Sequence, residues 1–243
     1  MIAKILIHPF QAFLKPFRLW SRYKNNMNKV ITIDGPSASG KGTLAILLAE
    51  RLNWKILDSG ALYRAFAYFS ISENDQRLIE QNLRKISFNI ADNSIQVLCE
   101  NEDISGHLRT EETAIQASKI SSLPSTREIL LPIQRFFSET SNLIADGRDM
   151  GSVVFPNANL KFFLDAAPEV RAKRRYLELQ KRGQEVNMHD LINDIVERDK
   201  KDRTRELSPL IKTEDSILLD STNLNQESIL AEALQHIKER NIL

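Results

Sequence analysis

Asp34-Gly35-Pro36-Ser37-Ala38-Ser39-Gly40-Lys41-Gly42-Thr43 is the stretch that decides the fold. The apolar run 29–33 (KVITI) precedes it, and leucines at helical spacing follow it. This order predicts a strand, a glycine-rich turn and a helix. Consecutive backbone N–H groups in such a turn form a concave cradle for phosphate oxygens, to which the helix N-terminus and Lys41 add positive charge. We therefore expect residues 35–43 to bind the phosphates of a nucleotide.

Gly42 is an informative departure within this stretch. In the general P-loop a Ser or Thr follows the lysine directly, whereas here Thr43 comes one place later, so the usual hydroxyl ligand for magnesium is displaced. The GKGT form resembles that of nucleoside monophosphate kinases and favours phosphoryl transfer between nucleotides. No Asn-Lys-x-Asp element, which a GTPase uses to read guanine, occurs in the sequence.

The alternation of strands and helices predicts the fold class. Further apolar runs at 54–57, 142–145, 160–164 and 216–219 are separated by helical patterns, and the last is followed by a helix over 226–240. Such alternation predicts an α/β fold with a parallel sheet covered by helices on both faces. Ligands bind beyond the carboxyl ends of the strands in these sheets, where Asp146 and Asp165 end two of the runs.

Two segments interrupt this alternation. Residues 86–90 and 94–98 predict an antiparallel hairpin across Asp92-Asn93, and helical patterns return through 110–140 with a break near Pro124. Residues 168–206 are dense in charge and predict two helices with Gly183 between them. A charged run of this kind is usually only a solvated helix face.

Length and composition limit the size of the core, the number of domains and the cellular compartment of the protein. With 243 residues and 42% hydrophobic content, the chain can build a substantial core in one large domain or two small ones. Its single cysteine, Cys99, excludes an internal disulfide, and no Cys/His spacing resembles a zinc site, so we expect a cytoplasmic protein. We interpret Cys99 as a packed strand residue rather than a nucleophile.

Residues 1–26 form a basic N-terminal extension with five Lys or Arg and no acidic residue. Because the whole chain has a formal net charge of +1, the remainder carries about −4, which does not suggest a nucleic-acid partner. Pro9 and Pro16 break the apolar runs, so neither a membrane-spanning helix nor a signal peptide is expected. A disordered tail, an interfacial anchor that gives a membrane-associated or partner-binding protein, and translation from a start upstream of Met27 remain open.

Two further stretches narrow the comparison. Ser59-Gly60-Ala61-Leu62-Tyr63-Arg64 and Ala145-Asp146-Gly147-Arg148-Asp149-Met150-Gly151, together with the loop, closely resemble bacterial cytidylate kinases, and the likeness runs from about Met27 to the C-terminus. The resemblance implies a P-loop kinase domain over 27–243, with a nucleoside-monophosphate-binding insert over about 60–135 and a helical lid over about 166–187. It also implies transfer of the γ-phosphoryl group of ATP to CMP, and to dCMP, in pyrimidine nucleotide metabolism, with Mg²⁺ as cofactor and a monomeric enzyme.

Several polar residues are candidates from their position alone. Arg64 and Arg148 lie beside the ends of core strands and could grip an acceptor phosphate with forked hydrogen bonds, or form surface salt bridges instead. Ser59 and Asp149 could hold the acceptor's phosphate and ribose, although Ser59 also suits a helix cap. Asp146 could organise magnesium through water, and Asp34 is a weaker candidate for the same role.

The resemblance assigns further residues that spacing alone would leave as solvated helix charges. Ser118, Arg127 and Asp202 match the residues that contact the cytosine base in cytidylate kinases. Arg198 and Arg205 match arginines near the ribose and phosphate. Arg198, Asp202 and Arg205 follow an i, i+4, i+7 spacing and share one helix face. The part that resembles the lid contributes Arg171, Arg174 and Arg175 as catalytic candidates beside Lys41 and Arg148.

The implied chemistry does not need a general base, because a nucleotide phosphate with a second pKa near about 6 is already largely ionised at neutral pH. Accordingly the four histidines lie outside every motif, and we expect them to be structural or exposed. Two other interpretations stay open. One is a kinase for AMP, UMP or dTMP, and the other is a non-catalytic module that binds ATP without transferring phosphate.

Overall fold

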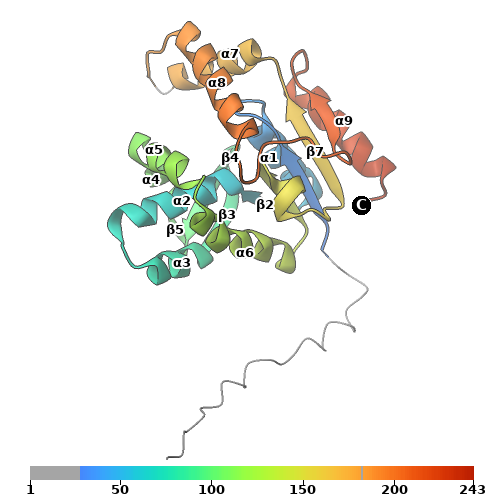
Figure 1. Cartoon of the computed structure of the whole chain (residues 1–243). Coiled ribbons are helices and arrows are strands. Elements are labelled where there is room, and N and C mark those ends of the chain that lie inside the picture. The colour runs from blue at the N-terminus through green and yellow to red at the C-terminus, as the bar shows by residue number, and fades with distance from the viewer. Residues whose placement is uncertain (1–27, 182) are drawn as a thin grey trace, which may run out of the picture.

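The computed structural model describes residues 28–181 and 183–243 (Figure 1). Its centre is a five-stranded sheet in which every recorded pairing is parallel. The strand order is β2-β6-β1-β7-β8, built from β1 (Val30–Asp34), β2 (Lys55–Asp58), β6 (Leu143–Gly147), β7 (Leu160–Asp165) and β8 (Ile217–Asp220). The predicted α/β fold is confirmed, and each predicted core strand lies within a residue or two of its expected position.

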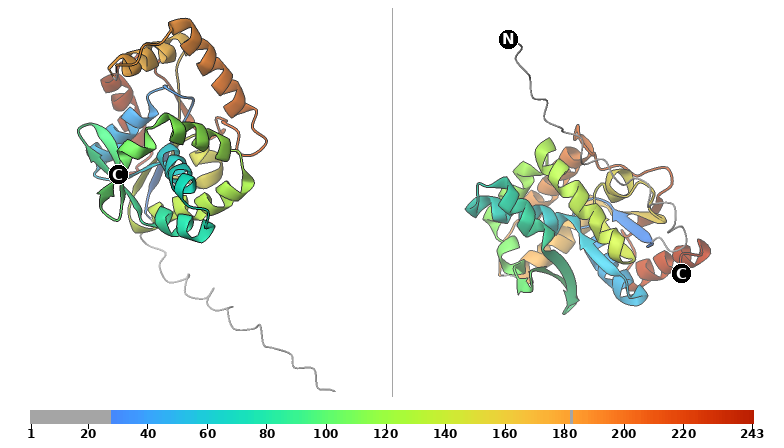
Figure 2. Two further views of the ribbon diagram at one scale, coloured as in Figure 1. Left: turned by 90° about the vertical axis from the view of Figure 1, so that its left-hand side faces the viewer. Right: turned by 90° about the horizontal axis from the view of Figure 1, so that it is seen from below.

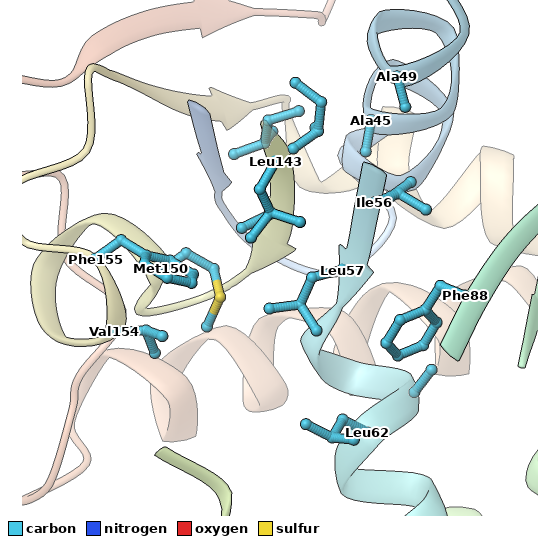
Figure 3. Close-up of a cluster of buried hydrophobic side chains, with 14 of the residues drawn as sticks. Ala45, Ala49, Ile56, Leu57, Leu62, Phe88, Leu143, Met150, Val154 and Phe155 are labelled. Atoms are coloured by element: carbon cyan, nitrogen blue, oxygen red, sulfur yellow. The ribbon is translucent and has the colours of Figure 1, made fainter. Parts of the chain in front are cut away.

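Helices cover this sheet and bring its apolar side chains into one core. Helices α1 (Lys41–Leu52) and α9 (Gln226–Glu239) pack against each other, and α2 (Ser59–Ser72) packs against β6. A π-helical turn, Met150–Val154, packs on β1 and β6. Figure 3 shows Ala45 and Ala49 of α1 on one side of this cluster, and Met150 and Val154 on another.

The insert that follows β2 contains a second, antiparallel sheet of three strands (Figure 2). Its elements are α3 (Gln76–Arg84), β3 (Ile86–Ala91), β4 (Ser94–Cys99), β5 (Glu102–Asp103), α4 (Ser105–Leu108), α5 (Glu111–Ile120) and α6 (Pro124–Thr140). The hairpin is confirmed, and both Asp92 and Asn93 adopt the left-handed conformation that a tight hairpin turn requires. Sequence patterns missed β5, since a two-residue strand leaves no alternation to detect.

The charged segment forms two helices, as predicted, with Gly183 between them at φ +73°. Helices α7 (Pro168–Lys181) and α8 (Met188–Arg203) pack against each other at the end of the sheet away from the small sheet (Figure 1). The predictions on residues 1–26 and on Met27 lie outside the described residues. Among the helices of residues 28–181 and 183–243, none combines the length and apolarity needed to cross a bilayer.

Gly35 joins β1 to the loop at a point where no side chain fits. Its φ is +151°, and a Cβ built there would lie 2.0 Å from the carbonyl oxygen of Leu164. We therefore expect Gly35→Ala to lower the free energy of unfolding by about 3 kcal/mol, through backbone strain and a steric clash. Urea denaturation checks this. Gly106→Ala is the control, since a Cβ there meets no atom within 4 Å and should change stability by less than about 0.5 kcal/mol.

Candidate active site

Two side chains of the loop between β1 and α1 donate hydrogen bonds to its backbone. Lys41, the first residue of α1, donates from Nζ to the carbonyl oxygen of Pro36 at 2.7 Å, and the Ser39 hydroxyl donates to the same oxygen at 3.0 Å. Ala38 and Gly40 both have positive φ, which curls the loop. Gly40 caps α1 without a side-chain hydrogen bond, so the N–H groups of the first turn are available to an anion.

Two ionisable groups near the loop, the buried Lys41 and the half-buried Asp146, interact electrostatically. Burial lowers the pKa of Lys41 to about 8, and the negative charge of Asp146 opposes this shift. Asp146, near the end of β6, has its pKa raised to about 7 by burial, with Lys41 opposing. A Cβ added at Gly42 would lie 3.5 Å from Oδ2 of Asp146, so any larger side chain at position 42 would press on this carboxylate.

Asp34 has a different environment from the one a metal ligand would have. Its two carboxylate oxygens accept backbone N–H bonds from Met150 at 2.8 Å and Gly151 at 2.7 Å. Burial raises its pKa to about 7, against the effect of these two hydrogen bonds. Asp34 therefore ties the π-helical turn to the end of β1, and this occupation disfavours it further as a magnesium ligand.

A cluster of opposite charges lies where β6 ends and α8 passes. Asp202 is only 2% exposed and accepts from Nε of Arg148 through Oδ2 and from Arg205 through Oδ1. The spacing predicts Arg198, Asp202 and Arg205 on one helix face, but α8 ends at Arg203, so for Arg205 this prediction is wrong. Arg205 reaches Asp202 from the segment after the helix, and Arg148 reaches it from the segment after β6. Two guanidinium groups are thus held together by one buried carboxylate.

A second cluster lies on the α2–α6 side of the same region. Arg127 of α6 forms an ion pair with the buried Asp149, and its guanidinium carbon lies 5.9 Å from the centre of the Tyr63 ring. Ser59, the first residue of α2, accepts a hydrogen bond from Nε2 of Gln134 at 2.9 Å. The cap of α2 is Asp58, which accepts from the N–H of Ala61, so Ser59 is not the cap residue.

Three predicted acceptor-site residues stand apart from these contacts. Ser118 is exposed on α5, and its backbone carbonyl accepts a hydrogen bond from the hydroxyl of Ser121. Arg64 lies 3.7 Å from Asp58 in an ion pair. Arg198 is exposed overall. Burial of its guanidinium group is the main cause that lowers its pKa to about 10, and the nearby positive charge of Arg148 lowers it further. Arg198 therefore stays positive at neutral pH.

The predicted lid arginines have three different environments. Arg171 is buried, pairs with Asp199 at 2.5 Å, and donates to the carbonyl oxygens of Ala166 and Ser37. Arg174 donates to the carbonyl of Ser39 at 3.0 Å and to Ser221. Both are therefore fixed against the loop, whereas Arg175 has 43% of its side chain exposed and pairs with Glu178.

The remaining candidates agree with their structural interpretations. Cys99 is half-buried on β4, where burial raises its pKa, so it is poorly suited to be a nucleophile. His107 stacks on Tyr68 with ring centres 5.2 Å apart, and His236 lies beside Glu239. Within the part of the chain that the structure describes, no group of three or more His, Cys, Asp or Glu could hold a metal ion.

Comparison with known proteins agrees with this geometry. A family model described as cytidylate kinase matches residues 31–239. The cytidylate kinase of Photobacterium profundum is 48% identical over 216 residues, which cover 86% of this chain and 95% of the relative. That of an Enterobacter species is 46% identical over 217 residues, covering 87% and 96%.

Solved structures are more distant. A shikimate kinase from Bacteroides thetaiotaomicron covers 88% of this chain and 99% of its own, with 13% identity and a TM-score of 0.48, too low to support any inference. The family match extends over most of the described residues, including both charge clusters and the loop. The chain therefore belongs to the cytidylate kinase family.

Proposed function

We propose that this chain transfers the γ-phosphoryl group of ATP to CMP, giving ADP and CDP, with dCMP as a second acceptor. The observation that carries the proposal is the convergence of Arg148, Asp202 and Arg205 on the carboxyl end of β6, beside the phosphate-binding loop. Phosphorus NMR of a mixture of ATP, Mg²⁺ and CMP tests it. ADP and CDP should appear in equal amounts, and only when both nucleotides are present.

On the donor side, residues 35–43 hold the β- and γ-phosphates through backbone N–H groups, and Lys41 leaves the Pro36 carbonyl to contact a phosphate oxygen. Asp146 suits a magnesium ion bound through water, because Mg²⁺ takes one or two carboxylates together with substrate phosphates and needs no preformed cage. Such an ion neutralises charge on the β- and γ-phosphates.

On the acceptor side, Arg148, Arg64 and Ser59 grip the monophosphate, with Arg198 and Arg205 nearby. Asp149 holds the ribose, and Ser118, Arg127 and Asp202 read the base. Hydrogen-bonding groups shaped to the amine and carbonyl of cytosine would be left unpaired by another base, which gives discrimination. In the described structure, Arg148 and Asp202 pair with each other, as do Arg127 and Asp149, so CMP would have to exchange these pairs for its own contacts.

Catalysis then depends on in-line alignment of donor and acceptor and on neutralising the transferring group, without a protein base. Closure of the α7–α8 pair as a lid would bring positive charge over the donor phosphates and expel water. A monomeric, cytoplasmic enzyme is part of the same proposal. The lone, half-buried Cys99 supports the cytoplasmic location.

Arg175 is the lid arginine that we expect to act on the substrate. Arg175→Ala should lower turnover roughly ten- to a hundredfold and change stability by less than about 0.5 kcal/mol, because an exposed pair adds little. Arg171→Ala should instead lower the free energy of unfolding by about 3 kcal/mol, since Asp199 loses its buried partner. Turnover and urea denaturation of both variants check this. Wild-type turnover in Arg175→Ala would remove Arg175 from the mechanism.

A further inference from the structure

Gln134 is a buried polar residue to which the family resemblance assigns no role. It lies on α6, is 3% exposed, and follows Arg127 by seven residues, so both side chains share one face of that helix. Arg127 reaches Asp149 from this face, and Gln134 reaches Ser59 of α2, which is itself 4% exposed. Gln134 is thus placed between the acceptor residues and the helix that carries one of them.

The contact with Gln134 decides what the Ser59 hydroxyl can do. A serine hydroxyl has one hydrogen to donate and two lone pairs that accept. Nε2 of Gln134 fills one lone pair at 2.9 Å, so the hydroxyl hydrogen remains for another partner. Within residues 28–181 and 183–243, no hydrogen bond donated by this hydroxyl is recorded. An anionic phosphate oxygen could accept this hydrogen bond from Ser59.

The direction of the Ser59 hydroxyl depends on Gln134. Ser59 is the first residue of α2, so no preceding helical turn offers a carbonyl to hold its hydroxyl, and without Gln134 the hydroxyl could rotate and direct its hydrogen away from the site. Gln134 also lines a cavity of about 240 Å³ with Tyr63, Arg127, Leu131 and Val154, on the side of α6 that faces the acceptor residues. Gln134 therefore lines the cavity beside the acceptor residues and does not lie deep in the hydrophobic core.

We propose that Gln134 is a positioning residue for the acceptor, whose amide orients the Ser59 hydroxyl so that its hydrogen points to the phosphate of CMP. This inference rests on the proposed role of Ser59 in binding the acceptor phosphate. Gln134 itself acts on the substrate only through Ser59. The effect should consequently appear in the binding of CMP and leave the binding of ATP unchanged.

A double-mutant cycle on the full chain tests the proposal. Gln134→Met keeps the shape of the side chain and removes the amide, and Ser59→Ala removes the hydroxyl. We expect Gln134→Met to raise KM for CMP roughly three- to tenfold, as partial loss of a hydrogen bond to a charged group would, with kcat and KM for ATP changed less than about twofold. In the Ser59→Ala background the same substitution should change KM for CMP by less than about twofold.

The control is Gln235→Met, the same substitution at an exposed residue of α9 whose side-chain amide donates to Glu239. It should leave all constants at their wild-type values. Wild-type KM for CMP in Gln134→Met, or an equal effect of that substitution with and without Ser59, would overturn the positioning role. Failure of the wild-type chain to phosphorylate CMP would instead overturn the proposed function. Melting temperatures identify any variant whose KM changes because its fold is weakened.

Discussion

Lys41→Ala is expected to fold normally and to lose at least about a hundredfold in turnover. The ammonium group is buried inside the loop and held by the Pro36 carbonyl, so it is already placed where the phosphates would bind. Removing one such charge from a dry site costs about 3 to 4 kcal/mol of transition-state stabilisation. Steady-state release of ADP, measured with saturating ATP and CMP, gives the loss.

Folding is measured separately, by circular dichroism and thermal melting of the same preparation. Lys119→Ala, at an exposed position on α5, is the matched control and should keep wild-type turnover. Turnover of the Lys41 variant within a few-fold of wild type would show that this lysine does not neutralise charge in the transition state.

Asp202→Asn is expected to raise KM for CMP by roughly ten- to a hundredfold and to weaken the preference for CMP over UMP. The substitution keeps the size of the side chain and removes the negative charge with which Asp202 would accept a hydrogen bond from the cytosine amine, once CMP has displaced its ion pair with Arg148. Losing a hydrogen bond to a charged group costs about 1.5 to 3 kcal/mol, which is roughly ten- to a hundredfold in affinity. The loss should fall on the acceptor, so KM for ATP should stay within about twofold of wild type.

Asp194→Asn on the exposed part of the same helix is the control for Asp202. Kinetics with CMP and UMP as acceptors give both the affinity and the discrimination. An Asp202→Asn variant that keeps the wild-type ratio of kcat/KM for CMP and UMP would remove this residue from base recognition, even if its stability falls.

Much of the fold could be predicted because its signals are local. The strand before Gly35, the loop and the helix after it follow one another directly, and parallel strands buried on both faces read as uninterrupted apolar runs. The hairpin was visible for the same reason, since Asp92 and Asn93 supply the positive φ values of its turn. Strand β5 and the π-helical turn escaped because each is too short to produce a period.

The site was predictable only in part, since it is assembled from distant elements. Its position after a core strand made Arg148 a candidate, and the resemblance added Asp202, but spacing cannot reveal that β6 and α8 place them in contact across 54 positions of sequence. Gln134 left one weak signal, a polar residue among Leu130 and Ile133 on the buried side of α6. Asp34 could not be recognised as a backbone clamp, because its partners are the N–H groups of two residues, 150 and 151, which carry no side-chain signature.

This site is expected to phosphorylate CMP in preference to other nucleoside monophosphates. The most direct measurement is kcat/KM of the wild-type chain with ATP and a panel of acceptors, with ADP release as the readout. CMP should give the highest value, dCMP should follow, and UMP, AMP and dTMP should be at least about tenfold poorer, because each leaves base-reading groups unpaired. A higher value for AMP or dTMP would contradict the assignment of the acceptor, and no ADP release with any acceptor would contradict phosphoryl transfer itself.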